Sequence, residues 1–160
     1  MRNNNLRMII GIADTTFARV DMAKFAIDVI KEYSKAEIKR YTVPGIKDLP
    51  VACKKLFLED KCNIVLALGM VGAKPIDKQC SHEASLGIAA VQLQTNKHVL
   101  EIFVHFDEAK DDKEIYNIAK KRTEKHTINA LELLKGKTSL SEHAGTGKRQ
   151  GKDDEGQIVF

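Results

Sequence analysis

The 160-residue sequence has no tryptophan and only three prolines, and aromatic residues make up just 6% of it. No stretch approaches the roughly 20 consecutive apolar residues that a membrane-spanning helix needs. The N-terminal segment MRNNNLR also lacks the apolar stretch of a signal peptide. We therefore expect a cytoplasmic protein without a membrane partner.

Cysteine and clustered charge are also scarce. The three cysteines, Cys53, Cys62 and Cys80, are odd in number and form no C-x-x-C pair, which is typical of reduced thiols. Cys80 lies near His82, but no second ligand pair has the spacing of a zinc site, so we expect no bound metal. The net charge of +4 is mild and the basic residues are dispersed, which argues against a nucleic-acid partner.

The length fits a single domain, with a core over about residues 8–134 and a charged, glycine-rich tail over 135–160. Strand-like and helical patterns alternate four times in the core. Strands are expected at 8–13, 37–43, 63–68 and 99–105, and helices at 20–33, 48–60, 77–95 and in a charged segment ending near Leu134. The first helix carries an apolar stripe of Met22, Ala26, Val29, Ile30 and Tyr33.

This alternation predicts a three-layer α/β/α fold with a four-stranded parallel sheet. The charged second strand belongs at an edge, which gives the strand order 2-1-3-4. A crevice then opens at the carboxyl ends of the first and third strands. The segments 14–19, 44–48 and 69–75 are expected to meet there.

The segment 43–50 combines a strand end with a helix start. Pro44 and Gly45 stop the second strand, while Asp48 stands at an expected helix N-cap with Pro50 in the first turn. Asp48 could serve only as this cap. Alternatively, its carboxylate and the nearby amides could bind a hydroxyl-rich ligand.

Other polar and aromatic residues fall at the same sheet edge. Phe17 could offer its ring to a flat ligand or could pack back on the first helix. Thr15 and Thr16 resemble the start of a phosphate loop, but no glycine accompanies them. His82 and His105 are candidate proton shuttles, with a solvated loop or surface position as the alternative for each.

Two further patterns are rejected, and one feature has two explanations. The tail segment 145–152 fails the spacing of a nucleotide-binding loop, and no strand precedes it. A receiver domain needs an aspartate at the end of the third strand, where this chain has Gly69 and Met70. The third helix is apolar over much of its circumference, so it lies either in a deep core or against another subunit.

Seven segments together resemble archaeal-type riboflavin synthase, a relative of lumazine synthase with a lumazine-synthase-like, flavodoxin-like fold. They are DTTFARVDMA (14–23), VPGIKDLPVACKKL (43–56), ALGM (67–70), CSHEASLG (80–87), TNKH (95–98), HFDEAKDDKE (105–114) and AGTGKRQG (144–151). The resemblance implies that two molecules of 6,7-dimethyl-8-ribityllumazine exchange a four-carbon unit to give riboflavin and 5-amino-6-ribitylaminouracil. This dismutation needs no redox cofactor. The resemblance leaves open whether Mg²⁺ assists.

The resemblance also implies where the substrate binds. The ring would face Phe17 and the ribityl chain would reach Asp48, in a site between subunits of a homopentamer. Phe103, Val104 and His105 would come from the neighbouring subunit. The full set of candidate substrate-binding residues is Thr15, Thr16, Phe17, Gly45, Lys47, Asp48, Gly69, Met70, Glu83, Phe103 and Val104, with His82 and His105 as candidate catalytic residues.

The loop after the third strand departs from lumazine synthase, which has G-x-T-x-H there to bind the phosphate of its second substrate. This chain has neither threonine nor histidine over 72–77. That difference favours the riboflavin-forming relative. His82 does not align with the missing histidine, so the general acid or base is not assigned. The alternatives are a lumazine synthase and a lumazine- or flavin-binding protein without catalytic activity.

Overall fold

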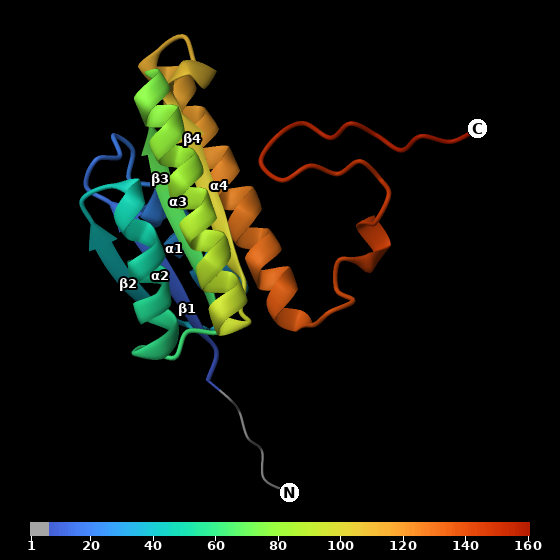
Figure 1. The fold of residues 1–160 in the computed structure, drawn as a ribbon. Coiled ribbons are helices and arrows are strands. Elements are labelled where there is room, and N and C mark those ends of the chain that lie inside the picture. The colour runs from blue at the N-terminus through green and yellow to red at the C-terminus, as the bar shows by residue number, and fades with distance from the viewer. Residues whose placement is uncertain (1–6) are drawn as a thin grey trace, which may run out of the picture.

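The computed structural model describes residues 7–160 (Figure 1). The expectation of no signal peptide rests mainly on residues 1–6, which lie outside this described part. The elements are β1 (Ile9–Thr15), α1 (Met22–Tyr33), β2 (Glu37–Val43), α2 (Leu49–Leu58), β3 (Ile64–Val71), α3 (Pro75–Thr95), β4 (Val99–His105) and α4 (Asp112–Lys135). Short 3-10 helices occupy Ile46–Asp48, Phe106–Glu108 and Ser141–His143.

The sheet has four parallel strands in the order β2-β1-β3-β4, which confirms the predicted topology. α1 and α4 cover one face, and α2 and α3 cover the other, so the fold has three layers (Figure 1). Ala13 of β1 lies beside Ala67 of β3, and Val71 of β3 lies beside His105 of β4. This register brings the ends of β1, β3 and β4 to one edge of the sheet.

The core is split by the sheet into two apolar clusters. Every residue of β3 is buried, as its nearly continuous apolar sequence requires for a strand covered on both faces. Leu66 and Leu68 face α1 and α4, whereas Val65 and Ala67 face α2 and α3. The alternation follows from the two-residue period of a strand.

α1 begins at Met22, two residues after its predicted start, because the Asp21 carboxylate accepts the Lys24 N–H at 3.3 Å and caps the helix there. Its apolar stripe faces the core as predicted, except at the end. Tyr33 is 65% exposed, so its assignment to the buried stripe was wrong. It is the last residue of the helix, where the chain turns away towards β2.

α3 begins at Pro75, two residues before its predicted start. Proline suits the first helical turn, and the Asp77 carboxylate accepts the Lys74 N–H at 3.1 Å. One side of α3 packs on the core, but the opposite side exposes Leu86, Ala89, Ala90 and Leu93. We call these four residues the α3 apolar face. Among residues 7–160, every helix is too short or too polar to span a lipid bilayer.

The tail after α4 contacts that helix around His126. The Gln150 side chain lies 3.0 Å from His126 Nδ1, and Arg122 Nε lies 3.5 Å from the Gly151 carbonyl. His126 is only 6% exposed. Burial, together with the charge of Arg122, lowers the pKa of His126 to about 4.

This lowered pKa predicts that the folded protein loses stability in acid at pH values higher than those at which carboxylates titrate. The unfolded chain takes up a proton near the ordinary value of 6.5 and the folded chain only near 4, so the stability is present above pH 6.5 and is lost as the pH falls towards 4. We expect His126→Gln to remove most of this loss. Urea unfolding of the wild type and of His126→Gln across this pH interval measures the loss of stability. If the free energies of unfolding of the two proteins fell in parallel, the assignment of the loss to His126 would be contradicted.

Candidate active site

A pocket of about 370 Å³ opens at the carboxyl ends of β1 and β3. It is lined by Phe17, Pro44, Gly45, Ile46, Lys47, Asp48, Met70, Val71, Gly72, Asp77 and Cys80. All three segments that the topology was expected to bring together contribute to it. Asp77 and Cys80 lie outside those segments and were missed as pocket residues, although they lie three positions apart in the first turns of α3 and so share a helix face.

Asp48 makes the tight turn of the 3-10 helix Ile46–Asp48. Its Oδ2 accepts the Gly45 N–H at 3.2 Å, and its own N–H donates to the Gly45 carbonyl at 3.1 Å. It precedes α2 as predicted, but its side chain caps no amide of α2, so the cap interpretation was wrong in that detail. The carboxylate turns back towards the shorter helix and lies exposed at the pocket wall.

Phe17 is 55% exposed and lines the pocket. Its ring contacts Phe106 edge to face, with a centroid distance of 6.4 Å, rather than packing on α1. The turn that carries it is held by the two preceding residues. The Thr16 hydroxyl donates to the Pro44 carbonyl at 3.3 Å, and the Thr15 hydroxyl accepts the Ala18 N–H at 3.3 Å. Thr15 and Thr16 are not among the residues that line this pocket; they line a separate cavity with Asp14 and Arg40.

The floor of the pocket is made by β3. Met70 lines it, but Gly69 has a packing role: a Cβ there would come within 2.7 Å of the Ile46 side chain and 3.0 Å of the Phe103 ring. Glycine is therefore needed for the Ile46 turn to approach the sheet so closely. At the rim, Lys47 Nζ forms an ion pair with Glu83 at 2.7 Å, and the hydrogen bond from Lys47 lowers the pKa of Glu83.

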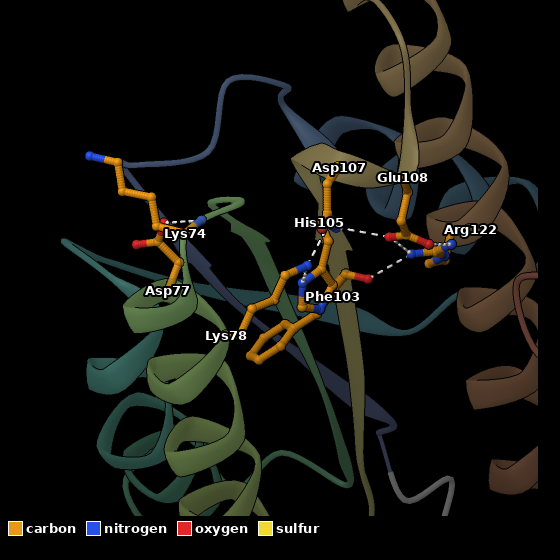
Figure 2. Close-up of polar contacts among 8 residues, drawn as sticks. All are labelled: Lys74, Asp77, Lys78, Phe103, His105, Asp107, Glu108 and Arg122. Atoms are coloured by element: carbon orange, nitrogen blue, oxygen red, sulfur yellow. Dashed lines mark hydrogen bonds and ion pairs between the residues drawn. The ribbon is translucent and has the colours of Figure 1, made fainter.

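The end of β4 carries a second polar cluster, and none of its residues lines the pocket. Figure 2 shows Lys78 reaching from the start of α3 towards His105, whereas the pocket residue Asp77 lies apart from this contact. Lys78 Nζ lies 3.1 Å from His105 Nδ1 and 2.6 Å from Asp107 Oδ1. His105 is half-buried. Its burial, followed by the positive charge of Lys78, lowers its pKa below the ordinary value.

A charged clamp holds the backbone of the same segment (Figure 2). Glu108 binds Arg122 through two contacts of 2.7 Å and accepts the His105 N–H at 2.9 Å. Arg122 also donates to the Phe103 carbonyl at 2.9 Å. Burial alone would raise the pKa of Glu108, but the hydrogen bonds from Arg122 and from the His105 amide outweigh it and hold this pKa at about 2.

The other candidate residues are placed less favourably. Val104 is fully buried in the cluster facing α1 and α4, so its side chain cannot touch a ligand, and only its main chain remains available. The Phe103 side chain is buried against Gly69. His82 is exposed on α3 and belongs to neither the pocket lining nor the His105 cluster. Over residues 7–160, the structure groups no three His, Cys, Asp or Glu side chains that could hold a metal ion.

Comparison with known proteins agrees with this geometry. The family model of 6,7-dimethyl-8-ribityllumazine synthase matches residues 7–138. A riboflavin synthase of Archaeoglobus fulgidus is 49% identical over 95% of this chain and 99% of its own length. A riboflavin synthase of Methanothermobacter thermautotrophicus is 50% identical over 93% and 98%, respectively.

A 6,7-dimethyl-8-ribityllumazine synthase of Methanothermobacter thermautotrophicus is also similar, at 39% identity, but the match covers only 49% of this chain. The similarity to the riboflavin synthases is therefore both higher and nearly complete in length. The chain belongs to the 6,7-dimethyl-8-ribityllumazine synthase family and, within it, to the archaeal-type riboflavin synthases.

Proposed function

We propose that the protein catalyses the last step of riboflavin biosynthesis, in which two molecules of 6,7-dimethyl-8-ribityllumazine give riboflavin and 5-amino-6-ribitylaminouracil. The observation that carries this proposal is the identity of about 50% over nearly the whole chain to proteins named riboflavin synthase. The pocket supports it, because it combines an exposed aromatic ring with an exposed carboxylate.

The pocket accommodates one substrate molecule, with one set of contacts for its ring and another for its ribityl chain. The flat lumazine ring lies against Phe17, where stacking contributes roughly 0.5–1.5 kcal/mol beyond the buried area. The ribityl hydroxyls reach the Asp48 carboxylate and the turn at Gly45. At the rim, Lys47 is paired with Glu83 and so is not set up to bind a phosphate, in keeping with a substrate that has none.

The second wall of the site comes from a neighbouring subunit. In this arrangement the end of β4 in one subunit, with His105, closes the pocket of the next. The α3 apolar face supports such an assembly, because it exposes two leucines and two alanines that a closed ring would bury. We propose a homopentamer, in line with the resemblance to lumazine synthase.

The reaction moves a four-carbon unit between identical molecules, so one substrate is the donor and the other the acceptor. No external oxidant or reductant enters the balance, and we propose that no redox cofactor takes part. Holding two rings face to face supplies much of the rate, since the methyl group at ring position 7 is intrinsically acidic. Of the two candidate histidines, His105 has the surroundings of a functional group, whereas the role of His82 stays a prediction.

We also propose that the protein works in the cytoplasm, where its thiols stay reduced. All three cysteines are free, and two of them, Cys53 and Cys62, are buried.

The direct test is to incubate the purified protein with 6,7-dimethyl-8-ribityllumazine and follow the absorbance of riboflavin. Formation of one riboflavin for every two lumazines consumed is expected. A lumazine synthase would instead consume a butanone phosphate, and a binding protein without activity would bind the lumazine without turnover. Either of these results would refute the proposal.

Asp48→Ala should weaken substrate binding about 10- to 100-fold, because the ribityl chain loses a charged acceptor worth roughly 1.5–3 kcal/mol. The binding constant is measured by fluorescence titration with the lumazine. Asp28→Ala is the matched control, because Asp28 is an exposed aspartate on α1 that does not line the pocket. Equal affinity of the Asp48 and Asp28 variants would rule out this role for Asp48.

A further inference from the structure

Lys78 was not among the residues expected at the site, yet it contacts the histidine at the end of β4. Its ammonium group lies between His105 Nδ1 at 3.1 Å and Asp107 Oδ1 at 2.6 Å (Figure 2). Lys78 follows the first turn of α3, and the pairing of β3 with β4 brings the end of β4 to that turn. The contact therefore depends on the fold and not on closeness in sequence.

The chemistry of this contact determines which nitrogen of His105 carries the proton. A lysine ammonium has three donors and no acceptor, so it can only donate to His105 Nδ1. Nδ1 must then be the unprotonated, accepting nitrogen of the ring. A neutral imidazole with an accepting Nδ1 carries its hydrogen on Nε2.

We propose that Lys78 is a positioning residue that holds His105 as the neutral Nε2–H tautomer, so that His105 donates a hydrogen bond to the lumazine ring. This inference rests on the proposed function, in which His105 faces the pocket of the adjacent subunit. In this form Nε2 cannot accept a proton from the substrate. His105 stabilises the negative charge that develops on the ring oxygens and is not the base.

The other charged groups around His105 agree with this assignment. Asp107 is engaged by Lys78 and Glu108 by Arg122, and within residues 7–160 the imidazole of His105 makes no hydrogen bond to either carboxylate. Glu108 instead accepts the main-chain N–H of His105, which fixes the backbone beneath the ring. Burial and the charge of Lys78 further lower the pKa of His105, which keeps the ring neutral.

Removal of Lys78 should reverse this arrangement. In Lys78→Met the cationic donor to Nδ1 is lost and the Asp107 carboxylate is no longer paired with it, so the imidazole should turn to an Nδ1–H tautomer and its pKa should rise. Nε2 then becomes an acceptor whenever the ring is neutral. Lys78→Arg keeps a cationic donor and should preserve the original tautomer.

The test is long-range ¹H–¹⁵N NMR of the histidine side chains in the full-length protein, which distinguishes the two tautomers without any substrate. We expect Nε2–H for His105 in the wild type, in Lys78→Arg and in the control Lys113→Met, where an exposed lysine of α4 is removed. We expect Nδ1–H or a charged ring in Lys78→Met. An Nδ1–H tautomer in the wild type, or no change in Lys78→Met, would overturn the proposal.

Kinetics provide a second readout that a merely structural role would not alter. The kcat of Lys78→Met should fall on the order of 10- to 100-fold as the pH rises through the new pKa of His105, with little change in KM. The wild type and Lys78→Arg should show no such fall over the same pH interval. Because the NMR result does not depend on turnover, a protein with the expected tautomer that forms no riboflavin would refute the proposed function and not the tautomer.

Discussion

Replacing Arg122 with methionine should lower the free energy of unfolding by about 3 kcal/mol, since removing one partner of a largely buried ion pair leaves the other charge without compensation. The Arg122 side chain is 10% exposed, and its partner Glu108 is 27% exposed. The Phe103 carbonyl also loses its hydrogen bond. Chemical denaturation at neutral pH measures the loss.

The matched control is Arg19→Met. Arg19 forms an ion pair with Asp112 at 3.1 Å, but both side chains are more than half exposed, so its loss should cost less than about 1 kcal/mol. Equal losses in the two variants would contradict the role assigned to the Arg122 clamp.

The same pair has a pH signature. The pKa of Glu108 is about 2 in the folded protein against an ordinary value of 4.5, so its contribution to stability is complete above pH 4.5 and is lost as the pH falls towards 2. The difference in the free energy of unfolding between the wild type and Arg122→Met should therefore become smaller as the pH falls through this interval. If this difference in the free energy of unfolding stayed constant, Glu108 would not be the group responsible for it.

Leu93→Glu should prevent subunit assembly and lower riboflavin formation on the order of 100-fold or more, because it puts a charge on the α3 apolar face, which the proposed contact buries. Leu93 is 86% exposed in the single chain, so the fold of each subunit should survive. Analytical ultracentrifugation gives the oligomeric state, and riboflavin absorbance gives the activity.

Tyr33→Glu is the control for this substitution, because Tyr33 is also an exposed large side chain but lies at the end of α1. It should assemble and react as the wild type does. A Leu93→Glu protein that forms riboflavin as a monomer would refute the proposal that the site lies between subunits.

The sheet could be predicted almost completely because β1, β3 and β4 each carry a short apolar run, whereas the charged residues of β2 mark it as a half-exposed edge strand. β1 continues two residues past its expected end at residue 13, to Thr15, and β3 also runs past its expected end. Its expected end was residue 68, but the strand continues through Gly69 and Met70 to Val71. Glycine has a low strand propensity, so in the sequence it indicates the end of a strand. Here, pairing with β4 overrides it, since Gly69 lies beside Phe103 and Val71 beside His105.

The pocket was predictable in part, because some of its residues follow directly from the order of the strands. Phe17 and Asp48 stand in turns at the ends of strands, and topology alone brings those turns together. Lys78 and Arg122 could not be found this way, because each acts on a residue 27 or 19 positions distant through a contact that only the packed fold creates. Thr15 and Thr16 were placed in the right turn, but sequence does not show on which side of it a hydroxyl lies.

The central claim is that one subunit supplies the pocket with Asp48 and the next supplies the end of β4 with His105. Coexpression of Asp48→Ala and His105→Ala chains in equal amounts tests this claim most directly, with riboflavin formation as the readout. At a lumazine concentration well below the weakened binding constant of Asp48→Ala, each variant alone should keep only a small fraction of the wild-type activity. Random assembly into a ring leaves about a quarter of the interfaces with both wild-type parts, so the mixture should recover about a quarter of the wild-type activity. A mixture no more active than the average of the two variants would contradict the shared site.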